Sequence, residues 1–273
     1  MAAGDLITAD YQYEYSGLLM GAGTSYIVER VDGLYSLPDI RSRDSERQDE
    51  HGLYSGVDLL SGRRIVIRLA LAEPDAPSLE SLLANAGRAF RPGTVEELFV
   101  FQRPAQGGKR FVKAKTKRKN FDAEIDWHYS RGAGRGFVEL QASDPRIYSL
   151  SLKSTQVTLA SGASAAGDLL VENDGDFDTF GTITIIGPTV DPRIQNTADG
   201  SKEIKLNITL TTEEMVIDLQ RKTVTVDGVD RYDVVRNDSQ WWRILPGTNI
   251  IKYNRTGTTG DSLMVIQHRD TWI

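Results

Sequence analysis

Short runs of alternating apolar and polar residues predict that this chain is built mainly of β-strands. In the run Glu203–Leu210, for example, the apolar residues Leu206, Ile208 and Leu210 alternate with polar ones. A period of two describes a strand with one buried and one solvated face. Further strand-like runs, rich in β-branched or aromatic residues, lie at Arg64–Leu71, Glu97–Phe101, Gly136–Ala142, Thr182–Ile186 and Thr223–Val226.

A tight hairpin is predicted at Asp227-Gly228, between the runs Thr223–Val226 and Val229–Val235. An Asp-Gly pair tolerates the positive φ angles that a two-residue hairpin turn requires. One helix is predicted at Ser78–Ala89, where Ser78 can cap the first turn. The apolar stripe of this helix consists of Leu79, Leu82, Leu83 and Ala86.

The 273 residues suggest two domains, with the boundary near residue 150. Asp144-Pro145 interrupts regular structure, and Ser161–Gly167 is predicted to be a loop of small residues. We expect residues 1–150 to form a β-sandwich or barrel-like domain that contains the short helix. Residues 151–273 are expected to form a second β-sandwich of the jelly-roll type. The charged stretch Asp39–Asp49 is predicted to be an exposed loop.

Composition and charge exclude several classes of protein. The chain has no cysteine, which excludes disulfides and thiolate metal sites. Its N-terminus lacks the pattern of a signal peptide, and no apolar run approaches the roughly 20 residues that cross a bilayer. We therefore expect a soluble protein that does not insert into membranes. Residues 1–150 carry 20 Lys and Arg against 21 Asp and Glu, and residues 151–273 carry 12 against 17, so neither half resembles a dedicated nucleic-acid-binding domain.

The sequence offers no catalytic constellation. The three histidines, His51, His128 and His268, stand alone, without the spacing of a helical zinc pair. The glycines of Gly132–Gly136 are predicted to form a hairpin loop rather than a phosphate-binding loop. The carboxylates of Glu172–Asp178 are predicted to form a solvated turn, because the twelfth position that an EF-hand requires to be Glu is Ile185. We expect no catalytic, metal-binding or cofactor-binding residues and no cofactor, and therefore no enzyme.

A run of lysines is the main concentration of charge. If residues 109–119 form a strand, Lys113, Lys115, Lys117 and Lys119 lie on one face. Lysines on a strand commonly keep it soluble and prevent edge pairing. The alternatives are a surface that faces an acidic partner subunit, or one that faces DNA passing through a tube.

Trp241-Trp242 is the most distinctive pair of residues. Adjacent residues on a strand point to opposite faces, so one tryptophan would enter the core and the other would face outward. The outward ring could pack against a neighbouring subunit, which we favour, or stack on a sugar.

Several motifs, in order along the chain, resemble the distal tail (Dit) family of siphophages, also called minor tail proteins. They are Gly33–Arg41 with Arg47, His51-Gly52 and Gly56; Gly62–Ile67 leading to Leu82-Leu83; Asp144–Ser149; and Gly187-Pro188, Pro192–Asn196, Ile217–Leu219, Val226–Gly228 and Trp242–Asn249. Each motif is short, but together they span nearly the whole chain. The likeness is strongest to proteins of actinobacterial phages.

The resemblance implies a structural protein of the virion, at the tail tip or baseplate, assembled in the host cytoplasm. The N-terminal domain would build a hexameric ring around a channel, and the C-terminal domain would be a galectin-like β-sandwich. The ring would join the tail tube protein to the tail-associated fibre or lysin hub protein, with the tape measure protein as a further candidate partner and DNA only as passing cargo. A competing hypothesis is a module that binds host-wall glycan during adsorption. A third, a cell-wall hydrolase, is disfavoured because the motifs of such enzymes are missing.

Overall fold

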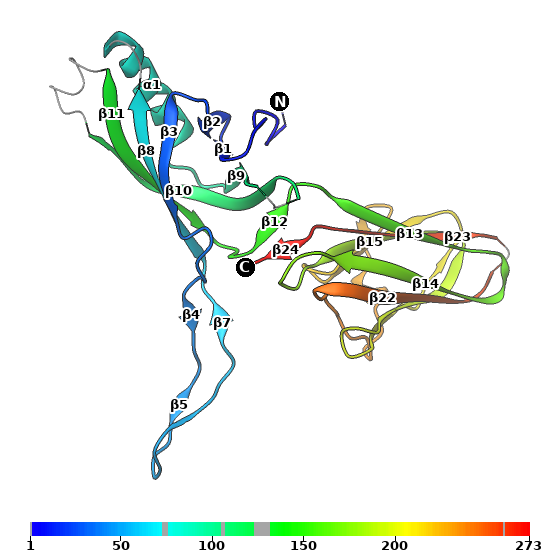
Figure 1. Ribbon diagram of the computed structural model, residues 1–273. Coiled ribbons are helices and arrows are strands. Elements are labelled where there is room, and N and C mark those ends of the chain that lie inside the picture. The colour runs from blue at the N-terminus through cyan, green and yellow to red at the C-terminus, as the bar shows by residue number, and fades with distance from the viewer. Residues whose placement is uncertain (1, 73–75, 105–106, 123–131, 259) are drawn as a thin grey trace. The chain divides into compact units, whose positions relative to one another are not determined.

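The computed structural model describes residues 2–72, 76–104, 107–122, 132–258 and 260–273, and it divides into two compact units (Figure 1). The N-terminal unit comprises Met1–Leu150 together with Ile273, and the C-terminal unit comprises Ser151–Trp272. Both units consist mainly of antiparallel strands, and the described residues contain one α-helix, so the predicted mainly β fold class is confirmed.

The N-terminal unit contains one long sheet with the strand order β2-β1-β9-β10-β11-β8-β3, and β12 also pairs with β10. The strands are β1 (Gln12–Tyr15), β2 (Leu18–Gly21), β3 (Tyr26–Asp32), β8 (Arg63–Ala72), β9 (Glu97–Gln102), β10 (Arg110–Asp122), β11 (Ala133–Ala142) and β12 (Ile147–Ser149). In this order β3 and β2 are the two end strands of the path, so each is paired along one edge only.

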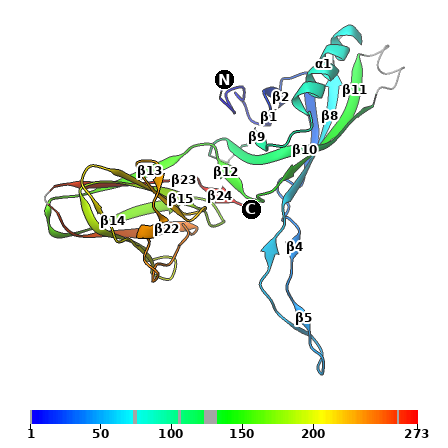
Figure 2. The same ribbon diagram turned by 180° about the vertical axis from the view of Figure 1, so that it is seen from behind.

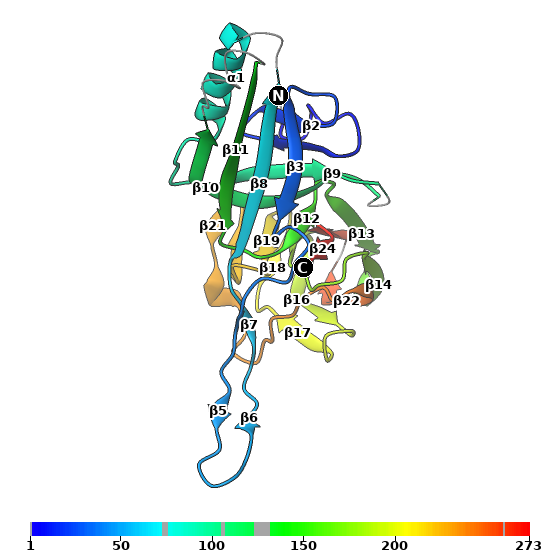
Figure 3. The same ribbon diagram turned by 60° about the vertical axis from the view of Figure 1, so that its left-hand side comes forward.

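Strand β8 shows why this sheet forms. Alternate side chains of β8 are buried, among them Ile65, Ile67 and Leu69, as the period of two predicted. Helix α1 (Ala76–Ala89) lies along the sheet beside β8 and β11 (Figure 3) and buries Leu79 and Ala86. The helix was therefore predicted correctly, but it begins two residues before Ser78, so Ser78 is not its N-cap. Its first turn can include Pro77 because the first N–H groups of a helix have no partner within the helix.

A long hairpin, residues 36–62, leaves the sheet after β3 and returns at β8; we call it the arm (Figures 1 and 3). Two short strand pairs hold it together. They are β4 (Ile40–Arg41) with β7 (Leu59–Leu60), and β5 (Ser45–Glu46) with β6 (Leu53–Tyr54). The predicted exposed loop Asp39–Asp49 belongs to one side of this arm, and its residues are exposed as expected.

The C-terminal unit is a sandwich of two sheets around one core (Figure 2). The first sheet has the order β13-β23-β15-β19-β20-β21, and the second has the order β14-β22-β16-β17 with β18 beside β16. The strands are β13 (Lys153–Leu159), β14 (Gly162–Asn173), β15 (Gly181–Ile186), β16 (Thr189–Asn196), β17 (Lys202–Lys205), β18 (Thr209–Leu210), β19 (Glu214–Asp218), β20 (Thr223–Val226), β21 (Val229–Asp230), β22 (Gly247–Thr258), β23 (Ser262–His268) and β24 (Thr271–Trp272). The core takes side chains from both sheets, for example Ile183 and Ile217 from one and Ile194 and Tyr253 from the other.

Two predicted loops of small residues are strands. Most of Ser161–Gly167 belongs to β14, which pairs with β22 from Gly162 onward, and most of Gly132–Gly136 belongs to β11. At Gly167 the reason is steric, because a Cβ atom there would lie 2.7 Å from Leu159 Cδ2 and 2.9 Å from Val157 Cγ2. The small residues were interpreted as signs of a turn. At Gly167, however, the absence of a side chain lets Leu159 and Val157 of β13 pack close to β14.

The predicted strand Glu203–Leu210 is broken into β17 and β18, although its alternating burial is observed. The partner strand β16 carries an irregularity between Val190 and Arg193, where Asp191 has φ 47° and Pro192 has no N–H to donate. The hairpin turn at Asp227-Gly228 is confirmed, with φ of 48° and 79°. Its second strand is shorter than predicted, because the 3₁₀ helix η1 (Tyr232–Val234) follows.

Candidate interaction surfaces

The lysine run lies on β10, but its four lysines do not share one face. The pairing of β10 with β11 shifts register between Thr116 and Arg118, so Lys117 is the extra residue of a bulge. Beyond the bulge the alternation of faces is inverted, and Lys119 stands opposite the buried Val138. Lys119 Nζ donates a hydrogen bond of 2.7 Å to the carbonyl of Gly87, in the last turn of α1.

The remaining lysines still form a basic surface. Lys113 and Lys117 are exposed, and Lys115 is half-buried. Among the described residues none of these three has an ion-pair partner, and the adjacent Arg118 lies with its Cζ 5.2 Å from the centre of the Phe137 ring. Whether this surface faces a partner or a channel stays a prediction.

The prediction that one ring of the tryptophan pair enters the core is confirmed for Trp242. Trp242 is 1% exposed, and its Nε1 donates a 3.3 Å hydrogen bond to the carbonyl of Ile194. Trp241 is half-buried and also packs against the core cluster, so it does not stand free on the surface. The prediction of opposite faces assumed a strand, whereas residues 241–243 belong to none. Neither ring is therefore a fully open platform for stacking on a sugar.

The arm carries the largest group of exposed apolar side chains in the N-terminal unit. Val57 is 69% exposed, Tyr54 61% and Leu53 54%, and Leu37, Ile40 and Leu59 are also exposed. Monomeric proteins rarely leave such groups of apolar side chains in water unless they mark an interaction site. The arm also carries three arginines against six Asp and Glu. Its exposed surface is thus apolar and net acidic, which suits contact with another protein.

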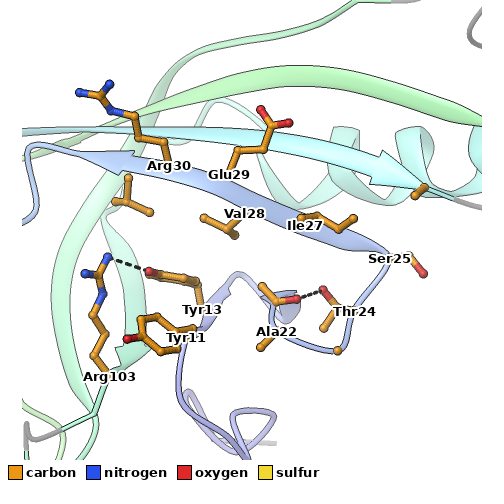
Figure 4. A pocket seen from close by; sticks show the side chains of 14 residues that line it. Tyr11, Tyr13, Ala22, Thr24, Ser25, Ile27, Val28, Glu29, Arg30 and Arg103 are labelled. Carbon is orange, nitrogen blue, oxygen red and sulfur yellow. Dashed lines mark hydrogen bonds between the residues drawn. The ribbon is translucent and has the colours of Figure 1, made fainter.

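A pocket of about 760 Å³ lies between β3, the loop that follows β2, and the start of β1 (Figure 4). Arg103 lies over the two tyrosines of the pocket, with Nη2 3.0 Å from the hydroxyl of Tyr13 and Cζ 5.9 Å from the centre of the Tyr11 ring. Its Cζ is also 4.5 Å from the centre of the ring of Tyr35, which is not part of the lining. Glu29 is the single carboxylate among the lining residues, so the pocket lacks the pair of acids that general acid–base chemistry commonly uses. No sequence pattern predicts this pocket, because its residues come from four separate segments.

The histidines and the carboxylate cluster show no catalytic arrangement. His51 is exposed in the arm, and His128 lies outside the described residues. His268 is buried, and its Nε2 donates a 3.0 Å hydrogen bond to the carbonyl of Glu172; burial lowers the pKa of this imidazole. Glu172–Asp178 forms a turn in which Asn173 Nδ2 donates to the carbonyl of Phe177, 2.8 Å away.

The search for metal sites gave no candidate within the described parts of the chain, where no three His, Asp or Glu residues come together. No described helix is long and apolar enough to span a membrane.

Comparison with known proteins relates part of the chain to a family and the whole chain to a known fold. Residues 174–272 match the family described as "Siphovirus-type tail component, C-terminal domain" (SPP1_Dit). The chain is similar to the crystal structure of Dit (gp 19.1) from phage SPP1, with a TM-score of 0.71 and 17% sequence identity. The match covers 96% of this chain and 99% of that one. The SPP1 protein is described as a paradigm of the hub adsorption apparatus in phages that infect Gram-positive bacteria. The baseplate of phage P2 contains a chain that is similar with a TM-score of 0.48 and 9% identity, over 94% of this chain and 97% of that one. No curated protein sequence matches.

The family match covers most of the C-terminal unit, and the SPP1 Dit fold extends over both units. The likeness to actinobacterial phages stays a prediction. The comparisons thus confirm the resemblance drawn from the sequence: residues 174–272 match the siphovirus-type tail component domain, and the chain has the fold of the SPP1 Dit protein.

Proposed function

We propose that this protein is a structural component of the distal end of a siphophage tail, located in the virion and assembled in the host cytoplasm. The observation that carries the proposal is the agreement of the whole chain with the SPP1 Dit fold, which leaves almost nothing of either chain uncovered. No catalytic step is assigned to the protein.

In this role the protein forms a hexameric ring. A ring of identical subunits requires two different surface patches on each subunit, which meet in a head-to-tail contact. The arm supplies one patch, because its exposed apolar side chains have no cover within the chain. The end strands β3 and β2 of the N-terminal sheet supply unpaired edges for the other.

The ring joins the tail tube protein to the tail-associated fibre or lysin hub protein, and the tape measure protein and the DNA pass through its channel. The lysine surface of Lys113, Lys115 and Lys117 is a candidate for the channel wall or for contact with an acidic partner. Lys119 lies beyond the bulge and bonds the end of α1, so it is not counted in this surface.

The test is the solution mass of the purified protein by light scattering, with negative-stain imaging of the same fraction. A six-fold ring with a central hole is the expected result. If the protein alone stays monomeric, the measurement is repeated with the tail tube protein added. A monomer that also fails to bind the tail tube would contradict the proposal, and titration with host-wall polysaccharide would then test the glycan-binding alternative.

A further inference from the structure

Arg63 is buried at the root of the arm, although arginine is almost never fully buried unless it is paired. The side chain is 1% exposed, and it makes no ion pair with any described residue. Burial lowers the pKa of its guanidinium, in line with the cost of removing a charge from water. A charge in such a position needs another source of stabilisation.

Main-chain carbonyls supply that stabilisation. Nη1 lies 2.8, 3.0 and 2.9 Å from the carbonyl oxygens of Gly33, Leu34 and Ser36, so its two N–H groups are shared among three acceptors. Nε donates to the carbonyl of Pro145, at 2.8 Å. The planar guanidinium, with its fixed set of donors, suits such a convergence of acceptors, and a lysine would satisfy fewer of them.

These four bonds join three parts of the chain. Residues 33–36 lead into the arm, Arg63 itself follows the end of the arm, and Pro145 comes after β11. The two strands of the root are also in close contact, since a Cβ atom on Gly33 would lie 1.9 Å from the carbonyl oxygen of Arg64. Arg63 therefore connects the entry and the exit of the arm to the body of the N-terminal unit.

Within the arm itself, little fixes its direction. Its two strand pairs contain two residues a side, and none of its side chains beyond Pro38 is buried. The Asp44 carboxylate accepts a 2.7 Å bond from the N–H of Gly56, but that bond joins the two sides of the arm to each other and not to the body. The root is the point at which orientation can be set.

We infer that Arg63 is a positioning residue, which fixes the direction in which the arm leaves the N-terminal unit and thereby sets the geometry of the contact between subunits. The second part of this inference rests on the proposed ring, and the first part does not. Arg63 acts through the carbonyls of residues 33–36 and touches no partner itself.

Spin-label distances can test the first part directly, because the natural chain has no cysteine. Labels are placed on the arm by Ser55→Cys and on the exposed face of α1 by Ala84→Cys, and the distance between them is measured by pulsed EPR. The parent protein is expected to give one narrow distance peak, and Arg63→Met is expected to lose it in favour of a broad distribution. Arg64→Met is the matched control, because Arg64 is the exposed neighbour that pairs with Glu139 across the sheet, at 2.8 Å.

A second control separates positioning from stability. Ile67→Ala weakens the same strand at a fully buried site but leaves the root bonds in place. It should keep the narrow peak, even if its melting temperature falls as far as that of Arg63→Met. Arg63→Lys retains the charge and should give an intermediate width, and this variant carries the test if Arg63→Met does not fold.

Three results would overturn the inference: a narrow peak in the folded Arg63 variants, a peak in Ile67→Ala as broad as in Arg63→Met, or a broad peak in the parent. Ring formation is scored separately on the unlabelled proteins, where Arg63→Met should lose rings that Arg64→Met retains. Failure of the parent to form rings both alone and with the tail tube protein would count against the proposed function and leave the distance result intact.

Discussion

The arm and the C-terminal sandwich are both made of antiparallel strands, but they place their apolar side chains in opposite environments. In the sandwich, alternating residues of the two sheets meet in a closed core, and Ile183, Ile194 and Tyr253 are completely buried. In the arm, Leu53 and Val57 face the solvent. A sandwich needs no partner to bury its apolar surface, whereas an arm of two strands has only one layer.

This difference implies that substitutions in the two regions should affect different measurements. In the sandwich, the loss of a side chain should lower the free energy of unfolding. In the arm, the same loss should leave folding unchanged and weaken assembly. The predictions below test this contrast, from the largest expected loss of stability to the smallest.

Trp242→Ala should give the largest loss. Trp242 is the largest of the fully buried side chains and contributes a hydrogen bond to Ile194, so its removal should destabilise the C-terminal unit by about 3–5 kcal/mol. Trp241→Ala should cost clearly less, since that ring is half-buried. Urea unfolding followed by circular dichroism measures both. Equal losses of unfolding free energy in the two variants would contradict this prediction.

Asn249→Ala should give the next largest loss. The Asn249 side chain is fully buried and bonds the N–H and the carbonyl of Leu245, at 2.9 and 2.8 Å, and also bonds Asn196. Its removal takes this partner from the N–H and the carbonyl of Leu245, whereas Asn196 keeps its bond to the carbonyl of Arg243, and the expected cost is about 2–3 kcal/mol. The exposed neighbour Thr248→Ala serves as the control in the same unfolding experiment. A change in Asn249→Ala no larger than in that control would contradict the prediction.

A smaller, pH-dependent loss is expected from His268. Burial lowers the pKa of the folded imidazole, and no described residue is placed to accept a hydrogen bond from Nδ1, the nitrogen that would bind the second proton. Because the unfolded chain then binds the proton more readily, this contribution to stability is complete above the unfolded pKa, about 6.5, and is lost as the pH falls through the folded pKa. The carboxylate of Asp270 opposes the shift, and Lys153 reinforces it.

Melting temperatures between about pH 7 and pH 5 measure this effect against His268→Gln, which keeps a donor but does not titrate. The wild-type protein should lose more stability over this interval than the variant does. Parallel pH profiles for the two proteins would show that the histidine does not contribute.

The sequence predicted most of the regular elements because their physical causes are local. Strand β8 and the Asp227-Gly228 turn follow from alternation and from tolerated φ angles, and both were confirmed. The bulge at Lys117 could not be predicted, because it depends on pairing with β11 rather than on the run of lysines itself. For the same reason the lysines were assigned to one face.

The site at the root of the arm was missed although a signal for it exists. The parity that buries Ile65 and Ile67 also places Arg63 on the buried face of β8. Parity alone does not establish that Arg63 is buried, because charged residues are expected at the surface. The carbonyls that accept its hydrogen bonds come from distant segments, so the reason for burying the charge appears only in three dimensions.

The smallest loss of stability is expected in the arm, and it should accompany the largest loss of assembly. The double variant Leu53→Ser, Val57→Ser removes two exposed apolar side chains and should change the free energy of unfolding by less than about 0.5 kcal/mol. If these side chains are buried between subunits, the variant should form few or no rings. The matched control is Val229→Ser, Tyr232→Ser, which removes two exposed apolar side chains from the C-terminal unit. Light scattering and negative-stain imaging compare the two, and rings that persist in the arm variant would show that the contact between subunits lies elsewhere.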